Sequence, residues 1–188
     1  MRTRFLLLAA AGLLLPAIAS PATPAGWYLA GNDPASYQAS RDVTVAHDGK
    51  KSASLESIRA PKGFGTLMQT FAATEYRGKR LRLTAWAKAS DVKDWAGVWM
   101  RVDGADMKSL GFDNMQNRPI KGTKDWARYD IVLDVPEIAS GIAFGILLSG
   151  EGKVWFSDIS FQTVDKSVPV TSSVGVMSPQ PKNLDFNQ

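Results

Sequence analysis

The sequence contains no cysteine and only one histidine among its 188 residues. The absence of cysteine excludes disulfide bonds, thiolate zinc sites, cysteine nucleophiles and redox-active cysteine pairs. Neither sign of charge is in large excess, because the chain has 22 Lys and Arg and 18 Asp and Glu, a formal net charge of +4. Loss of Arg2 and Arg4 with an export signal would leave 20 basic against 18 acidic residues. That balance indicates no nucleic acid partner and no anionic membrane surface.

What is present fits a folded protein. Hydrophobic residues make up 45% of the chain and charged residues 21%. These fractions exclude a disordered or collagen-like chain, and the length allows one domain with a tail.

The N-terminus has the pattern of an export signal. Two arginines precede an apolar run of eleven residues, Phe5 to Leu15, and Ala17-Ile18-Ala19 supplies the small-x-small pattern of a cleavage site. A helix of that length spans about 16 Å, well short of the ~30 Å hydrocarbon core, so no membrane anchor is expected. The pattern predicts a signal peptide over residues 1–19 and a periplasmic or secreted protein. Cleavage after Ala22 or Ala25, or a buried helix instead of a signal, are the alternatives.

The rest of the chain alternates apolar and polar residues with a period of two, interrupted every 8–15 residues by turn residues. This pattern predicts an all-β domain, a two-sheet antiparallel β-sandwich of jelly-roll type, over residues 26–165. Ser149 to Gly152 is expected to close a hairpin, and His47 to Lys50 a turn between two strands. The expected strands are 27–30, 37–40, 52–58, 64–73, 79–89, 95–103, 127–135, 142–148 and 154–164. Shared parity predicts a core that contains Leu81, Leu83, Val98, Met100, Ile131, Leu133, Phe144 and Ile146.

Residues 166–188 form a Ser/Pro-rich tail by composition. Within it, Asn183-Leu184-Asp185-Phe186 alternates as a strand does, so residues 183–187 are candidates to return to the sandwich as an extra strand. A frayed chain end is the alternative.

Four segments carry a family resemblance. Tyr76 to Lys88, with Gly49 to Ser52 before it, resembles the middle of galactose-binding-like jelly-roll modules, a fold shared by many carbohydrate-binding modules. Gly152 to Ile159 resembles the end of these modules. Gly111 to Ile120 resembles a bacterial subgroup of uncharacterised domains that are exported or appended to transcription regulators. The resemblance covers residues 27–165 and implies the fold more than any function.

Catalytic motifs are missing from the sequence. A Ser-His-Asp arrangement would need His47, which we expect to be an exposed turn residue, and there is no Gly-x-Ser-x-Gly elbow. The four glutamates fall in or beside expected turns and edges, and no pattern pairs two carboxylates for glycoside hydrolysis. No P-loop or dinucleotide fingerprint occurs. We therefore expect no catalytic residues.

Two polar and aromatic groups are the candidate ligand-binding residues. Trp86 and Trp99 fall on the non-core parity of two strands, together with Arg82 and Arg101, and indole rings stack on the C–H faces of sugars. Burial of both tryptophans under a loop or the tail is the alternative reading. The second group is a dense polar cluster, which could recognise hydroxyls or a carboxylate or could merely close turns. Its members are Asp113, Asn114, Gln116, Asn117 and Arg118.

The resemblance also implies a candidate structural calcium site. Related jelly rolls hold calcium at a late aspartate, which Asp158 matches, beside a turn equivalent to Gly49-Lys50. The glutamate-bearing first strand of those modules is missing, and calcium needs six to eight oxygens. No other cofactor is expected.

Taken together, the sequence predicts a monomeric, exported, non-catalytic binding module for carbohydrate or cell-envelope glycan. The alternative is a structural or protein-interaction domain without a small ligand, its outer tryptophans packed under its own tail or a partner.

Overall fold

The computed structural model describes residues 23–172. This part contains nine strands and three 3-10 turns, and no α-helix. The strands are β1 (Tyr28–Gly31), β2 (Tyr37–His47), β3 (Lys50–Ser57), β4 (Phe64–Ala72), β5 (Arg80–Asp103), β6 (Ser109–Asp113), β7 (Ile120–Asp134), β8 (Gly141–Ser149) and β9 (Lys153–Val164). The 3-10 turns span Pro34–Ser36, Thr74–Tyr76 and Ala105–Met107. Across residues 23–172, no helix has the length and apolar character needed to span a membrane.

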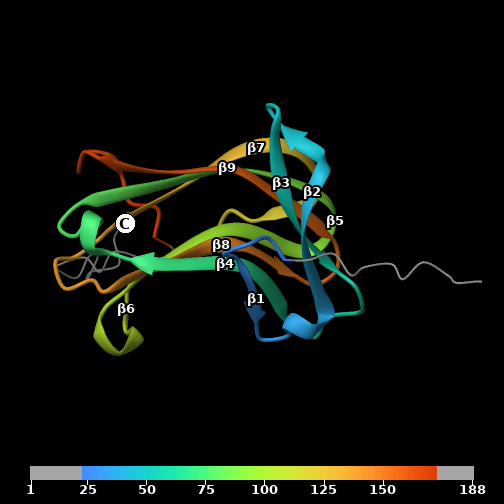
Figure 1. Ribbon diagram of the computed structural model, residues 1–188, viewed down its shortest axis with the longest axis horizontal. Helices are drawn as coiled ribbons and strands as arrows, with labels where there is room; N and C mark the ends of the chain where they lie inside the picture. The colour runs from blue at the N-terminus through green and yellow to red at the C-terminus, as the bar shows by residue number, and fades with distance from the viewer. Residues whose placement is uncertain (1–22, 173–188) are drawn as a thin grey trace, which may run out of the picture.

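The strands form one antiparallel sheet that curls into two packed layers (Figure 1). The first, which we call the β8 layer, has the order β1-β4-β8-β5-β6. The second, the β9 layer, has the order β7-β5-β9-β3-β2. The predicted all-β, two-sheet antiparallel sandwich is confirmed.

Strand β5 belongs to both layers. Residues 80–90 pair with β9 and residues 95–103 pair with β8, so this 24-residue strand bends from one layer into the other. The register against β7 shifts repeatedly between Ala87 and Ala96, and Asp91 adopts a positive φ of 55°. The inward side chains change from odd positions, up to Ala89, to even positions from Val92 onward. The prediction of two separate strands here was wrong, because the turn-forming residues between them bend the strand without ending it.

The core lies between the two layers. All eight predicted core residues are buried and belong to one hydrophobic cluster. Leu81 and Leu83 face it from the β9 layer, while Val98 and Met100 face it from the β8 layer. Apolar area removed from water in this cluster is the main stabilising contribution to the sandwich.

The β2–β3 hairpin closes where the sequence predicted a turn. His47 pairs with Lys50, and Asp48 and Gly49 both have positive φ, 47° and 73°. Two consecutive left-handed residues suit a tight hairpin turn, which explains the Asp-Gly pair.

The predicted hairpin at residues 149–152 was wrong. Strand β8 pairs with β4 and β5, whereas β9 pairs with β3 and β5, so this connection crosses between layers. Gly150 and Gly152 have positive φ, and a Cβ at Gly152 would meet the Cα of Val92 at 2.7 Å. Turn residues between two strands indicate a reversal of the chain, but they do not state which strand the chain meets next.

The first residues of the predicted tail lie against the sandwich. The Arg80 guanidinium donates to the carbonyls of Lys166 and Val168, both at 2.6 Å. The backbone N–H of Thr171 donates to the Val132 carbonyl, and the backbone N–H of Val132 donates to Thr171 Oγ1. We call residues 166–172 the C-terminal strap. The predicted signal peptide and the candidate strand 183–187 lie outside the described residues.

Candidate functional site

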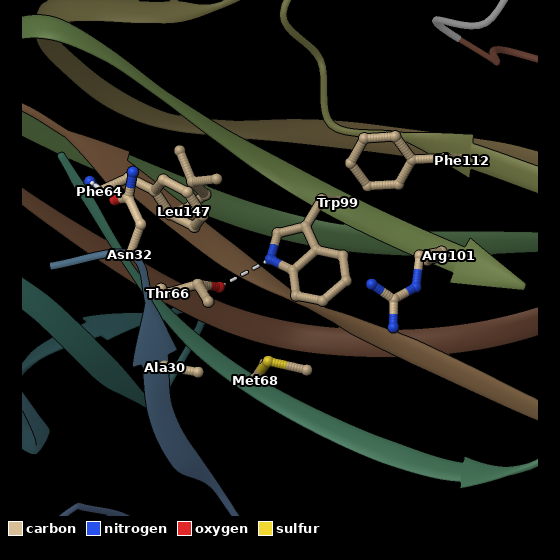
Figure 2. Close-up of a pocket in the computed structure, with 10 residues that line it drawn as sticks. Ala30, Asn32, Phe64, Thr66, Met68, Trp99, Arg101, Phe112 and Leu147 are labelled. Atoms are coloured by element: carbon tan, nitrogen blue, oxygen red, sulfur yellow. Dashed lines mark hydrogen bonds between the residues drawn. The ribbon is translucent and has the colours of Figure 1, made fainter. Parts of the chain in front are cut away.

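A pocket of about 350 Å³ opens on the outer face of the β8 layer. Its walls come from β1, β4, β5, β6 and β8, together with the turn after β1 (Figure 2). The lining residues are Ala30, Gly31, Asn32, Phe64, Thr66, Met68, Trp99, Arg101, Phe112 and Leu147. Three aromatic rings and several apolar side chains surround a few polar groups, a composition typical of small-molecule sites.

Trp99 lies at the centre of this pocket (Figure 2). It projects outward from β5, and its indole Nε1 donates to Thr66 Oγ1 on β4 at 2.7 Å. Because β8 lies between β5 and β4, the indole ring extends across β8. Gly145 pairs directly with Trp99 there, and a Cβ at Gly145 would meet the Leu67 carbonyl at 2.2 Å. A side chain at position 145 would therefore clash with β4, and β8 carries a glycine where the ring crosses it.

A second hydrophobic cluster surrounds the indole on this outer face. Trp99, Ala143 and Leu147 form its buried part. The aromatic and apolar side chains packed against it are Phe64, Met68, Trp95 and Phe112. Trp99 is only 6% exposed, so it presents little of its surface to solvent. The ring is held rigidly by packing and by one hydrogen bond.

Arg101 supplies the charged group of the pocket. Its Nε and Nη2 donate to the two carboxylate oxygens of Asp103 at 2.7 and 3.0 Å. The side chain of Asp103 is 5% exposed and that of Arg101 34%. A bidentate pair of this kind fixes the guanidinium plane, and the buried carboxylate balances its charge.

The predicted platform of Trp86 and Trp99 does not exist, because β5 changes layer between them. Trp86 and Arg82 lie on the outer face of the β9 layer, whereas Trp99 and Arg101 lie on the outer face of the β8 layer. The strand alternation correctly predicted that both tryptophans point away from the core. It could not show that they point away from opposite sides of it.

Trp86 is covered by the tip of the β2–β3 hairpin. The imidazole of His47 stacks on its indole with ring centroids 4.1 Å apart, and Trp126 lies 5.3 Å from the same imidazole. The predicted exposed position of His47 was therefore wrong, because its side chain is only 15% exposed. Its nearest carboxylate is Asp158, 3.9 Å from Nδ1. Among the described residues, this buried Nδ1 has no hydrogen-bond partner.

The polar cluster of residues 113–118 closes the loop between β6 and β7. Arg118 binds both carboxylate oxygens of the fully buried Asp113, at 2.6 and 3.1 Å. Asp113 and Asn114 also accept the backbone N–H groups two residues further on, and Asn117 accepts from Arg118. Gln116 and Asn117 are exposed, and none of the five residues lines the pocket. Ligand binding by this cluster stays a prediction.

Asp158 is paired with a positively charged side chain of the protein. The ammonium of Lys50 forms a short ion pair with Asp158 Oδ1. Within residues 23–172 there is no group of three or more His, Cys, Asp or Glu residues that could hold a metal ion. The geometry gives calcium binding at Asp158 no support, and it stays a prediction.

Sequence reasoning missed most of the pocket. Phe64, Thr66 and Met68 alternate along β4, and Leu147 lies on β8. Strand β8 is apolar on both of its faces, and its outer apolar residues were a sign that something covers that face. Asn32 carried no signal, since asparagine after a strand is common in turns.

No protein-family model matches the chain. A curated relative, an uncharacterized HTH-type transcriptional regulator of Bacillus subtilis (strain 168) named YbfP, is 45% identical over 167 residues. The match covers 87% of this chain, which spans 57% of the length of that relative.

Solved structures resemble the fold at low sequence identity. Tailspike protein 4 of bacteriophage CBA120 (enzymatically active domain) matches with a TM-score of 0.59 at 16% identity, over 74% of this chain and 20% of that one. The CBM22-1 xylan-binding domain of Paenibacillus barcinonensis Xyn10C matches with 0.55 at 11% identity, over 78% and 90%. The module TmCBM61, solved with beta-1,4-galactotriose, matches with 0.50 at 11% identity, over 76% and 91%. Several structural neighbours are thus carbohydrate-binding modules, which agrees with the fold resemblance.

Proposed function

We propose that this chain is a non-catalytic binding module for carbohydrate or cell-envelope glycan, and that the ligand occupies the pocket around Trp99. The observation that carries the proposal is the pocket of about 350 Å³, lined by three aromatic rings and one arginine on an outer sheet face. We further propose, from the signal-like N-terminus, that the module acts outside the cytoplasm.

The chemistry of the pocket suits a sugar. Indole and phenyl rings pack against the C–H faces of pyranose rings, and a guanidinium donates hydrogen bonds to ring substituents. Trp99 is only 6% exposed, so Phe64 and Phe112 provide further aromatic surface on the walls. The bidentate bond to Asp103 holds Arg101 in one orientation, which reduces the entropy lost on binding.

The lining supports binding rather than hydrolysis. No Asp, Glu, His or Ser is among the residues that line this pocket, so the lining supplies neither a carboxylate pair nor a nucleophile with its base. The sandwich fold of xylan- and galactotriose-binding modules adds weight to this reading, although fold alone does not determine function.

A second candidate function rests on the relative from Bacillus subtilis, which is named a transcriptional regulator. In that setting the same pocket would sense a ligand for an attached DNA-binding module. Both candidates share the pocket and its ligand, so one binding experiment tests their common premise.

The experiment is a pull-down of the full chain on insoluble polysaccharides, with tryptophan fluorescence titrations against soluble oligosaccharides. Ala30→Trp places a large ring at the edge of the pocket and should abolish retention. Ala72→Trp adds the same ring to an exposed position of β4 outside the pocket lining, so it should bind as the natural protein does. Failure to retain the protein on any glycan, or equal retention of both variants, would contradict the proposal.

A further inference from the structure

We infer that the pocket selects neutral sugars that carry an acetamido group, such as N-acetylhexosamines. The inference rests on the proposed function and names the ligand class of the same pocket. It follows from an inventory of which side-chain donors and acceptors in the lining are still available.

Two of the four polar side chains in the lining are already engaged. The indole Nε1 of Trp99 donates to Thr66 Oγ1 at 2.7 Å. The Thr66 hydroxyl in turn donates to the carbonyl of Ile146 at 2.9 Å, and this residue is buried. Both groups serve the structure of the sheet, so neither brings a free donor to a ligand.

Asn32 offers an unpaired amide donor. Its Oδ1 accepts the backbone N–H of Phe64 at 2.7 Å, which identifies the other side-chain atom as the amide nitrogen. That nitrogen has no hydrogen-bond partner among the described residues, and Asn32 is exposed. A ligand that carries an acceptor could therefore bind this amide nitrogen.

Arg101 offers only donors. Nε and Nη2 are bound to Asp103, which leaves Nη1 without a hydrogen bond to the described residues. Figure 2 shows Asn32 and Arg101 on opposite sides of Trp99. The pocket thus presents one unpaired donor group on each side of an aromatic centre.

The charge balance favours a neutral acceptor over a carboxylate. The buried carboxylate of Asp103 already neutralises Arg101, so a uronate would add a second anion to a single cation within largely apolar walls. An uncompensated charge is costly in such surroundings. A carbonyl oxygen accepts the same hydrogen bonds without that penalty.

The remaining lining is apolar and suits a methyl group. Phe64, whose backbone N–H binds Asn32, packs with Leu147 in the outer cluster. An acetamido group combines an acceptor carbonyl with a methyl group a few ångströms away. Its carbonyl would accept from Asn32 Nδ2, while its methyl would contact Phe64 and Leu147.

The first test compares three soluble probes on the full chain by isothermal titration calorimetry: chitotriose, cellotriose and trigalacturonate. Chitotriose should bind at least tenfold more tightly than either of the others. Equal or tighter binding of cellotriose or trigalacturonate would overturn the acetamido preference and leave the glycan-binding proposal standing. Absence of binding by all three, together with no retention on any polysaccharide, would overturn both.

The second test uses Asn32→Asp. This change keeps the oxygen that accepts from Phe64 and replaces the free donor with an acceptor, so chitotriose affinity should fall at least tenfold with the melting temperature preserved. Gln162→Glu makes the same chemical change at an exposed position on β9, in the other layer, and should leave affinity unchanged. Unaltered affinity in folded Asn32→Asp would overturn the assignment of the carbonyl to Asn32. If Asn32→Asp does not fold, the comparison of the three probes tests the acetamido preference.

Discussion

Trp99 shows how an outward-facing residue can still be buried. Its position on β5 directs it away from the core, yet the ring lies across β8 and reaches Thr66 on β4. Sequence alternation describes the direction of a side chain relative to its own strand. The two neighbouring strands determine whether water reaches it.

We predict that Trp99→Ala lowers the free energy of unfolding by roughly 3–5 kcal/mol, because it removes the centre of the outer cluster. Trp99→Phe keeps most of the apolar contact and loses the hydrogen bond to Thr66, so its loss should be near 1 kcal/mol. Urea denaturation measures both values. A loss below about 0.5 kcal/mol for Trp99→Ala would show that the indole is not an essential packing element.

The core residues were predictable from the sequence, whereas the pocket was predictable only in part. Parity identified Leu81 and Val98 as buried, and it placed Trp99 and Arg101 on an outer face. The partners of Trp99 come from β4 and β8, which lie far from it in the sequence. No local pattern specifies which strands become neighbours across a sheet.

Among the elements, the β2–β3 hairpin is unusual because its tip folds over the outer face of its own layer. Ser52 Oγ donates to the Val45 carbonyl at 2.6 Å, and the Trp155 indole donates to Asp42 at 2.9 Å. His47 then reaches as far as Trp86 on β5. The hairpin therefore fills the position that a ligand would need in order to stack on Trp86.

Trp86→Ala should loosen this tip, because the stacking partner of His47 disappears. Amides of residues 43–50 should exchange with deuterium at least tenfold faster, while those of β8 stay protected. Tyr28→Ala removes an exposed aromatic side chain from β1 in the other layer and is the matched control. Unchanged exchange in the hairpin tip of Trp86→Ala would show that other contacts hold it in place.

The same hairpin should make stability dependent on pH. Burial alone would raise the pKa of Asp42, but hydrogen bonds from Trp155, Val45 and Thr44 outweigh it and hold that pKa well below the ordinary 3.8. A carboxylate with a lowered folded-state pKa stabilises the protein above the unfolded pKa and loses that contribution as the pH falls. The contribution of Asp42 should thus be complete above about pH 4 and decline below it.

Thermal melts of the natural protein and of Asp42→Asn at pH 7, 4 and 2.5 test this pH dependence. The variant should melt at a lower temperature at pH 7, and the difference should shrink as the pH falls. A difference that stays constant over this range would show that the carboxylate charge is not responsible.

Most strands were predicted because alternation is a local signal, but β6, the end of β2, the start of β7 and two connections were missed. The chain passes through residues 90–95 as one bent strand, and it crosses between layers at residues 149–152. Both segments carry turn residues such as Asp91 and Gly150, whose positive φ fits a bend as well as a reversal. Pairing with strands that are distant in the sequence decides whether such a segment bends or reverses the chain.

On the scale of the whole molecule, the C-terminal strap joins the two layers at one edge. Arg80 donates from Nε and Nη2 to Asp134, both at 2.9 Å, and from Nη1 to the strap. The hydrogen bond from Arg80 holds the pKa of Asp134 below its ordinary value. Ser172 Oγ then donates to the Phe112 carbonyl at 3.0 Å, beside the pocket.

We predict that Arg80→Met lowers stability by about 2 kcal/mol, since hydrogen bonds from a charged group to the strap are lost. The melting temperature should fall by about 4–8 °C for a chain of this size. Arg128→Met is the control, because Arg128 is half exposed and pairs with Asp130 on its own strand, so its effect should stay below about 1 kcal/mol. Equal losses in the two variants would mean that the strap contributes nothing to stability.

The two-layer sandwich itself followed from the sequence, because alternating strands with one apolar face must bury that face against a second sheet. The curl of one sheet into both layers did not follow, since it depends on the irregular pairing of residues 87–96.

That shared strand has a consequence for how the chain folds. Neither layer is complete without its half of β5, and β3 pairs with β9 across about a hundred residues of intervening chain, as Ala53 with Phe156. Closing such distant pairs makes folding slow, on the order of milliseconds to seconds. The amides of the two layers should therefore become protected from exchange in a single kinetic phase. Because both layers contain part of β5, neither layer should fold before the other.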